Sequence, residues 1–259
     1  MIILVTGGAG FIGSHIADRY IGLGHKVVIL DNLSSGNLEN VPSEGTFIEG
    51  DITDRERVLQ IFNDYRIEVV NHHAAQMDVR KSVEDPAYDA TVNILGTLNL
   101  LEAACQAGVE KFIFASTGGA IYGEQDQYPA DERHATNPIS PYGVSKLAAE
   151  KYIHYYHAQY GLRYFILRYS NVYGPRQNPH GEAGVVAIFC KALANNGQVT
   201  INGDGLQSRD YVYVGDVVEA NVMALEQEAN LLCNVGTGVE TDVVTLYRWA
   251  DQYEMNGSR

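Results

Sequence analysis

The sequence predicts an α/β fold built on a doubly wound parallel sheet, and three features indicate it. Short runs rich in Val, Ile, Leu and Phe alternate with helical stretches over the first two-thirds of the 259-residue chain. Most of these apolar runs are continuous, as expected for strands that helices cover on both faces. The first run leads directly into a glycine-rich turn, Gly7–Gly13. This order of elements predicts a parallel sheet with right-handed crossovers.

The regular elements of this first part follow one another closely. Strands are expected at Ile2–Thr6, Lys26–Leu30, Thr46–Glu49, Val69–Asn71, Lys111–Ala115 and Tyr164–Arg168. Helices are expected at Asp54–Tyr65 after the capping residue Thr53, at Pro86–Gln106 before Gly108, and at Tyr142–Tyr160 between Pro141 and Gly161.

The chain changes in character after Arg168. Loops are predicted at Gly174–Gly184, which is rich in Pro, Gly, Asn and His and would lie over a site, and at the polar turn Gly203–Asp210. Helices are expected at Val185–Asn195 and Asp216–Gln227, a returning strand at Leu232–Val235, and a further helix around Thr245–Tyr253. We therefore expect a large domain over residues 1–170 and a smaller region over 171–259, with 212–236 returning to the large domain.

Composition and charge exclude several classes of partner. The net charge of −14 argues against nucleic acid and an anionic membrane surface, because both require a basic patch. An anionic small ligand is still compatible, since a local cation and a helix N-terminus can hold phosphate. Cys105, Cys190 and Cys233 are few and far apart, which fits a reducing cytoplasm and argues against a disulfide framework or a structural zinc site. The sequence suggests no other metal site, no signal peptide and no apolar run near the roughly 18 residues of a spanning helix.

The glycine-rich turn indicates a dinucleotide site. Gly7 permits a tight turn, Gly10 lets the backbone approach a pyrophosphate, and Gly13 allows close packing of the following helix on the strand. The phosphates would lie on the free N–H groups at the start of that helix, around Phe11 and Ile12. Glycines alone are weak evidence, because a plain strand–turn–helix joint also uses them.

The end of the second strand strengthens this interpretation and selects the cofactor. Asp31 lies 18 residues after Gly13, close to the position of a carboxylate that accepts hydrogen bonds from the adenine ribose. Such a carboxylate repels a 2′-phosphate, and the following segment with Asn32, Ser35 and Gly36 contains no Arg to hold one. The sequence therefore predicts NAD rather than NADP, bound by the domain of residues 1–170.

A second motif indicates the chemistry. Tyr142 and Lys146 are four residues apart near the start of a predicted helix, so their side chains share one face. A nearby ammonium, helped by a positive nicotinamide, favours the phenolate and lowers the tyrosine pKa below its usual value of about 10. Tyr142 would then take a proton from a substrate hydroxyl as hydride leaves the same carbon. The alternative is a solvated helix face, which is common for an isolated Tyr-x-x-x-Lys.

Together, the segments TGGAGFIGSH, DNLSSG, HHAA, SPYGVSK, RYSNVYGPR and RDYVYV resemble the extended short-chain dehydrogenase/reductases. Their order and spacing are most similar to the UDP-galactose/UDP-glucose 4-epimerase family, from Met1 to about Thr241. The resemblance implies an isomerase of galactose metabolism that oxidises C4 of a UDP-hexose, turns the 4-keto intermediate and reduces it on its other face. The alternatives are epimerisation of a UDP-uronate or an N-acetylated sugar, or a catalytically silent NAD-binding protein.

The resemblance also implies roles for individual residues. Tyr142 and Lys146 would be the catalytic pair, and residues 171–259 would form the substrate-binding region. The positions expected beside the cofactor or the substrate are Asp51 and Ile52 at the adenine, the backbone of His73, Ala74 and Ala75 at the cleft, Asn93 as a structural or relay residue, Tyr169 near the nicotinamide, and Asn171 and Val185 at the UDP-sugar.

One catalytic position departs from the family pattern. Many members carry a Ser where this chain has Gly118, so Thr117 is expected to hydrogen-bond the sugar O4, with Ser116 as the alternative. Related 4,6-dehydratases have an Asp–Glu pair after this Thr, because elimination of water needs an added acid and base. Gly118 and Gly119 occupy those positions here, which favours epimerisation.

The remaining expectations concern phosphate, quaternary structure and length. Arg209 is the candidate for the substrate phosphates, because a guanidinium matches phosphate geometry; the alternative is a surface salt bridge. His154 and His157 are expected on a partly exposed helix face rather than in a metal site. The resemblance implies a homodimer through the helices Pro86–Gln106 and Tyr142–Tyr160. The family also continues with a further segment of the substrate-binding domain, so this chain is either a natural short form or truncated. In both cases we expect an open pocket with weak substrate affinity.

Overall fold

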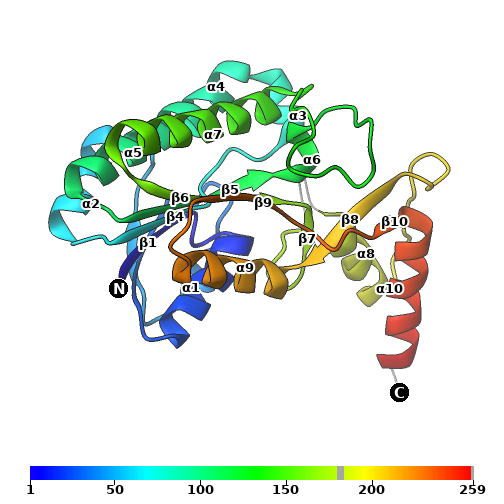
Figure 1. Ribbon diagram of the computed structural model, residues 1–259. Coiled ribbons are helices and arrows are strands. Elements are labelled where there is room, and N and C mark those ends of the chain that lie inside the picture. Colours follow the sequence, from blue (N-terminus) through cyan, green and yellow to red (C-terminus); the bar gives the residue numbers. More distant parts are fainter. Residues whose placement is uncertain (180–183, 258–259) are drawn as a thin grey trace.

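The computed structural model describes residues 1–179 and 184–257, and it confirms the predicted fold class. A parallel seven-stranded sheet has the order β3-β2-β1-β4-β5-β6-β9, which places β1 in the interior of the sheet (Figure 1). The strands are β1 (Ile2–Thr6), β2 (Lys26–Asp31), β3 (Thr46–Glu49), β4 (Val69–His72), β5 (Lys111–Thr117), β6 (Arg163–Tyr169) and β9 (Leu231–Val235). The expected strands are therefore present, with ends that differ by at most two residues.

Helices cover both faces of this sheet (Figure 1). Helices α1 (Phe11–Gly22) and α9 (Val214–Glu226) lie on one face, and α2 (Arg55–Asp64), α5 (Gly96–Ala107) and α7 (Pro141–Tyr160) lie on the other. Successive residues of a strand point to opposite faces, so Leu4 belongs to one buried cluster while Ile3 and Val5 belong to the other. This two-sided burial explains why the strands have continuous apolar runs.

Two predicted helix boundaries were wrong in detail. Asp54 caps α2, because its side chain accepts from the N–H of Arg57, whereas the Thr53 hydroxyl donates to Asp51. The stretch expected as one helix from Pro86 is divided into α4 (Pro86–Ala90), the π-helical turn η2 (Thr91–Leu95) and α5.

A small second sheet lies beyond the carboxyl ends of the main strands (Figure 1). It has the order β10-β8-β7 and consists of β7 (Asn171–Tyr173), β8 (Ser208–Tyr213) and β10 (Glu240–Asp242). The predicted turn Gly203–Asp210 was wrong at its end, because residues 208–210 pair with residues 240–242. These strands are short and polar, so their sequence carries no continuous apolar run.

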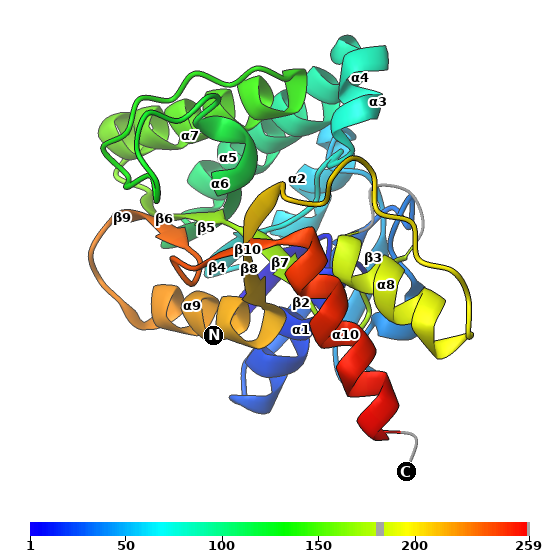
Figure 2. The same ribbon diagram turned by 90° about the vertical axis from the view of Figure 1, so that its right-hand side faces the viewer.

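The remaining helices are short or belong to the second region. Helices α8 (Val185–Ala194) and α10 (Val243–Gly257) pack beside the small sheet, as Figure 2 shows, and Phe189 meets Tyr247 edge-on with ring centroids 5.8 Å apart. The short elements η1 (Leu38–Asn40), α3 (Val79–Glu84) and α6 (Gly118–Ile121) complete the described chain. Among the described residues, no helix is long and apolar enough to cross a membrane.

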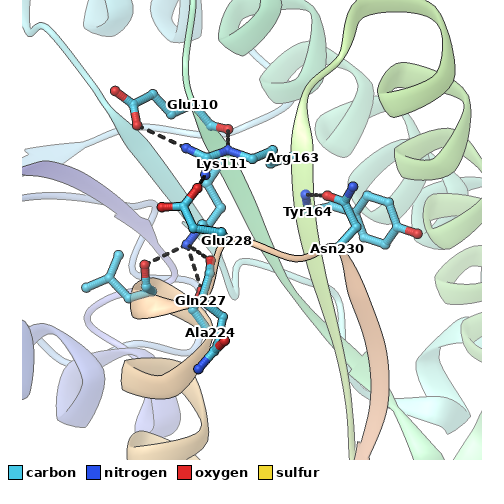
Figure 3. Close-up of polar contacts among 9 residues, drawn as sticks. Glu110, Lys111, Arg163, Tyr164, Ala224, Gln227, Glu228 and Asn230 are labelled. Carbon is cyan, nitrogen blue, oxygen red and sulfur yellow. Dashed lines mark hydrogen bonds and ion pairs between the residues drawn. The ribbon is translucent and has the colours of Figure 1, made fainter.

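A buried lysine joins the returning segment to the main sheet (Figure 3). The ammonium of Lys111, on β5, donates to the carbonyls of Ala224, Leu225 and Gln227 at 2.9, 2.6 and 2.7 Å. These carbonyls lie at the C-terminus of α9, where a cation complements the helix dipole. Nearby, the side chain of Asn230 accepts from the N–H of Tyr164 at 2.8 Å. These contacts hold α9 against the sheet and align β9 with β6.

Candidate functional site

The glycine turn after β1 is tightly packed. Gly7 has a φ of +69°, and a Cβ there would lie 2.6 Å from the N atom of Ala74. A Cβ at Gly13 would lie 2.3 Å from the carbonyl oxygen of Gly7, so α1 starts directly on the turn. Gly10 is the N-cap of α1 and provides no side-chain hydrogen bond, so the first N–H groups of the helix, around Phe11 and Ile12, can bind an anion.

Carboxylates line the loops beside this turn. Asp31 is buried at the end of β2 and accepts from the N–H groups of Ala9 at 3.0 Å and Leu33 at 2.8 Å. A Cβ at Gly36 would lie 3.0 Å from Asp31 Oδ1, so that glycine allows the loop with the exposed Ser35 to pass close to the carboxylate. Asp31 thus joins the glycine turn to the loop after β2.

Asp51 and its neighbours form the next part of the same edge. Burial raises the pKa of Asp51, but hydrogen bonds from Thr53 and Asn32 outweigh it and lower the pKa overall. Ile52 packs under α5, where a Cβ at Gly96 would lie 2.6 Å from its side chain. The positions predicted for the adenine end of a dinucleotide therefore lie together around the ends of β2 and β3.

A chain of hydrogen bonds behind the glycine turn orders the segment that follows β4. The Thr6 hydroxyl accepts from the N–H groups of His73 and Ala74, each at 3.2 Å, and it lies 2.7 Å from Nδ1 of His72. On the other side, Nε2 of His72 lies 3.0 Å from the hydroxyl of Thr97, which donates to the carbonyl of Asn93. Since that hydroxyl proton is engaged, His72 must donate from Nε2 and accept at Nδ1. His72 is therefore neutral with a defined tautomer, and burial lowers its pKa well below the usual value.

His73 follows β4 and packs against the end of β6. Its ring stacks on Tyr169 at the end of β6, with centroids 5.9 Å apart and an angle of 17°. Nε2 of His73 is buried without a hydrogen bond from any described residue. Burial and the charge of Lys146 lower the pKa of His73 to about 3. The Tyr169 hydroxyl accepts from the side chain of Asn221 on α9 at 2.8 Å, so Tyr169 is fixed by Asn221 as well as by the His73 ring. An apolar or aromatic ligand face could lie beside it.

Asn93 occupies the π-helical turn η2, an irregularity that is frequent at functional sites. Its side chain accepts from the N–H of Gln76 at 2.9 Å and donates to the Gln76 carbonyl at 2.9 Å, to Asp89 at 3.0 Å and to the Ser145 hydroxyl at 3.2 Å. It therefore links the segment after β4, which includes Ala75, to the start of α7. The sequence predicted this residue, and His72 belongs to the segment HHAA, but Asp89 lies in no local motif that marks it.

The predicted catalytic pair lies at the start of α7. Ser140 caps this helix by accepting from the N–H of Gly143, and Pro141 occupies the first turn. Lys146 is only 4% exposed, and its ammonium lies 4.5 Å from the centroid of the Phe114 ring. Burial lowers the Lys146 pKa to about 8, although Asp89 and Glu150 oppose that shift. A buried ammonium of this kind lies where it can act on charge in the cleft.

The prediction that Lys146 and a positive nicotinamide together lower the pKa of Tyr142 concerns the protein with its cofactor bound. In the chain by itself, burial and the negative charge of Asp89 raise the pKa of Tyr142, because both effects disfavour the phenolate. The positive charge of a bound nicotinamide would act in the opposite direction and favour the phenolate.

The two candidate hydroxyls on β5 differ in their surroundings. Ser116 donates to Glu150 at 2.6 Å, and Glu150 forms a buried ion pair with Arg168 at 2.7 Å. Ser116 is therefore part of a buried network behind Lys146. Thr117, at the N-cap of α6, is only partly buried, and its hydroxyl forms no hydrogen bond with the described residues.

The predicted substrate residues lie on the small sheet and at the start of α8. Asn171 opens β7 beside Tyr211 of β8, and its side chain donates to the Asp210 carbonyl at 3.4 Å. Arg209 is exposed on β8, with its guanidinium on the Ser208 carbonyl at 2.6 Å and no ion pair to a described residue. Val185 begins α8. Residues 180–183 of the loop predicted at Gly174–Gly184 lie outside the described part of the chain.

The histidines of α7 have packing partners. His154 and His157 both meet the ring of Tyr164 edge-on, with centroids 4.8 and 5.4 Å apart. Within residues 1–179 and 184–257, no group of three or more His, Cys, Asp or Glu side chains is placed to hold a metal ion. These histidines therefore have a packing role.

The neutral histidines make stability sensitive to acid. Because the folded pKa of His73 is about 3 and the unfolded value is about 6.5, the unfolded chain binds the additional proton between these pH values. Stability is therefore expected to fall as the pH drops below about 6, by about 1.4 kcal/mol per pH unit for this residue. His73→Phe keeps the stacking on Tyr169 and removes the titration, so urea unfolding between pH 6 and 4 should show a slope smaller by that amount. Equal slopes would contradict the assignment, and a comparison at pH 8 separates out any change in packing.

Known proteins share this architecture. A sequence profile described as the NAD dependent epimerase/dehydratase family matches residues 3–236. The chain is 48% identical to the UDP-glucose 4-epimerase of Mycolicibacterium smegmatis over 250 residues, which cover 94% of this chain and 80% of that protein. It also resembles the structure of a UDP-glucose 4-epimerase with UDP-glucose from Thermotoga maritima, with a TM-score of 0.97, 51% identity, and coverage of 98% and 83%. The Thermus thermophilus UDP-glucose 4-epimerase in complex with NAD has a TM-score of 0.93, 49% identity, and coverage of 98% and 84%.

Proposed function

Because the chain belongs to the NAD-dependent epimerase/dehydratase family, we propose that it is the enzyme that its relatives represent, an NAD-dependent UDP-glucose 4-epimerase. It interconverts UDP-galactose and UDP-glucose. One observation supports this proposal most directly: the Lys146 ammonium lies 4.5 Å from the centroid of the Phe114 ring, and that ring lies beside His72, whose Nδ1 is 2.7 Å from the Thr6 hydroxyl at the start of the glycine turn. The proton-transfer pair and the dinucleotide turn thus belong to one site.

The residues around the glycine turn fit NAD. The N–H groups at the start of α1 would hold the pyrophosphate, and Gly7 and Gly13 keep that approach free of side chains. Asp31 would bind the adenine ribose and exclude a 2′-phosphate, while Asn32, Ser35, Gly36, Asp51 and Ile52 would surround the adenine end. Ala74, Ala75, Asn93 and Tyr169 would line the nicotinamide end. When bound, NAD supplies the acceptor and donor of the hydride at C4 of the hexose.

The chain's own residues would transfer the proton of the sugar O4 hydroxyl. Tyr142 would take the O4 proton at its phenolic oxygen and return it, and Lys146 would stabilise the negative charge of the phenolate. The Thr117 hydroxyl would hydrogen-bond O4. Asn171, Val185 and Arg209 would hold the UDP part, which supplies binding energy remote from the reacting carbon.

The same region argues against elimination of water. Gly118 and Gly119 start α6 directly after Thr117 and provide neither an acid nor a base. Loss of water from a hexose needs both groups in addition to Tyr142. The site therefore supports epimerisation and not dehydration.

The decisive experiment is turnover of UDP-galactose by the purified protein without added NAD. UDP-glucose is detected through a coupled dehydrogenase. Product formation would support both the reaction and a tightly held cofactor. Absence of product, also with NAD supplied, would refute the proposed sugar specificity.

The hydroxyl assignment makes a separate prediction. Thr117→Val is expected to lower kcat by roughly 10²-fold with little loss of stability, because it removes a hydrogen bond to O4 alone. Ser116→Ala is expected to lower stability by roughly 1–3 kcal/mol, since it removes the donor to buried Glu150, and to keep most of kcat. Steady-state kinetics and urea unfolding of both variants test this. The reverse pattern would assign the role to Ser116.

The quaternary structure and the compartment are part of the proposal. Apolar side chains remain exposed on α4, η2 and α7, namely Tyr88, Leu95, Val144, Tyr152 and Tyr155. A cavity of about 520 Å³ lies beside them between Asp89, Ile94 and Ile139. We propose a homodimer that buries this face, in the cytoplasm as the small number of widely spaced cysteines suggests. A monomeric mass in light scattering would contradict the dimer.

A further inference from the structure

We propose that Asp89 is a positioning residue for the reaction: its buried carboxylate orients Asn93 and Gln76 and places a negative charge beside Tyr142 and Lys146. This rests on the proposed function, because it concerns the same catalytic pair. Asp89 lies on α4, far in sequence from both the glycine turn and α7. No local motif marks it in the sequence.

The hydrogen bonds of Asp89 explain its geometry but not its charge. Its side chain is 1% exposed, and Oδ1 accepts from Gln76 Nε2 and from Asn93 Nδ2, each at 3.0 Å. Oδ2 is buried and accepts no hydrogen bond from the described residues. An asparagine could provide Oδ1 to both donors without the cost of a buried charge. The two hydrogen bonds therefore do not by themselves require a carboxylate at this position.

The Asn93 amide that donates to Asp89 also donates to the hydroxyl of Ser145, which donates to the carbonyl of Tyr142, so the charge of Asp89 lies next to the first turn of α7. Together with burial it raises the pKa of Tyr142, and it opposes the lowering of the Lys146 pKa by burial. Both residues consequently hold their protons more firmly. The pair then rests as a neutral phenol and an ammonium until the positive charge of the cofactor is present.

Other charged groups around the pair are balanced or distant. Glu150, on α7, also acts on Lys146, but it is paired with Arg168 of β6. His72 and His73, after β4, are neutral because of burial. The charged residues of α3, which packs against α7, are Arg80, Lys81 and Glu84, and Lys81 and Glu84 are exposed together with Asp85. Asp89 is thus the carboxylate that bears on both members of the pair.

The test uses Asp89→Asn, which keeps Oδ1 and removes the charge. The pKa of Lys146 is measured in the full chain as purified, by ¹³C NMR of the lysine ε-methylenes, with the Lys146 signal assigned through Lys146→Met. We expect this pKa to fall by roughly one unit in Asp89→Asn. The acid limb of the pH profile of kcat should move to lower pH by a similar amount, because Tyr142 loses its proton more readily. Asp85→Asn is the matched control: it removes an exposed carboxylate four residues away and should change neither value.

Three results would overturn the proposal. A Lys146 pKa unchanged in Asp89→Asn would reduce Asp89 to an anchor for Asn93, a role that the pH profile does not report. A changed Lys146 pKa with an unmoved acid limb would show that the charge has no part in the reaction. An equal shift in Asp85→Asn would show that the effect is not specific to this site. If Asp89→Asn does not fold, Asp89→Ser retains a small acceptor and takes its place. The NMR measurement needs no turnover, so it separates failure of this inference from failure of the proposed function.

Discussion

Tyr142→Phe is expected to lower kcat by roughly 10³-fold while NAD stays bound. The substitution removes only the phenolic oxygen that exchanges the O4 proton. The half-buried ring can stay in place, and the backbone N–H of Tyr142 keeps its hydrogen bond to Ser82 at 3.2 Å. Turnover of UDP-galactose gives kcat, and the absorbance of extracted cofactor gives NAD occupancy.

Tyr160→Phe is the matched control for this variant. Tyr160 is exposed at the other end of the same helix, so the same chemical change there should leave kcat within about twofold. A Tyr142→Phe protein that keeps more than about a tenth of kcat would remove Tyr142 from the proton transfer.

Arg168→Met is expected to lower the free energy of unfolding by about 3–5 kcal/mol. Arg168 and Glu150 are buried, with side chains 4% and 1% exposed, and they contact each other through two hydrogen bonds at 2.9 and 2.7 Å. Removal of the guanidinium leaves the Glu150 carboxylate buried without its countercharge. Chemical unfolding in urea, followed by circular dichroism, measures the loss.

Two further variants make this prediction specific. The double variant Glu150→Met with Arg168→Met should be considerably more stable than Arg168→Met alone, because no unpaired charge remains. Arg55→Met breaks an exposed pair with Glu102 and should cost less than about 1 kcal/mol. A loss of similar size in Arg55→Met and Arg168→Met would show that burial of the pair has no special effect.

The buried pair also supports the active site. Arg168 Nη1 donates to the Tyr122 hydroxyl at 2.9 Å, and that hydroxyl donates to Asn234 of β9 at 2.6 Å. Through Ser116 and Glu150 the same network reaches β5 and α7. The helix that carries Tyr142 and Lys146 is therefore tied to three neighbouring strands of the main sheet.

Local patterns in the sequence were sufficient to predict the strands of the main sheet and the two motifs. Each strand covered on both faces needs a continuous apolar run, and a tight turn against the Ala74 backbone needs glycine at position 7. Tyr142 and Lys146 are one helical turn apart, so their proximity also follows from spacing alone. In all these cases the physical requirement acts between residues that are close in the chain.

Only the tertiary structure decided which polar groups form hydrogen bonds or ion pairs with one another. Ser116 and Thr117 are adjacent and chemically alike, yet only Ser116 meets a buried carboxylate, which comes from a residue 34 positions away. His72 is neutral because it is buried, with Thr6 and Thr97 on either side of its ring, and the buried Asp89 accepts from Gln76, which is 13 positions away. The small sheet was missed for the same reason, since its strands pair residues about 30 to 40 positions apart and are short. Hydrogen bonding and charge depend on the distance in space between groups, and the fold brings these groups together.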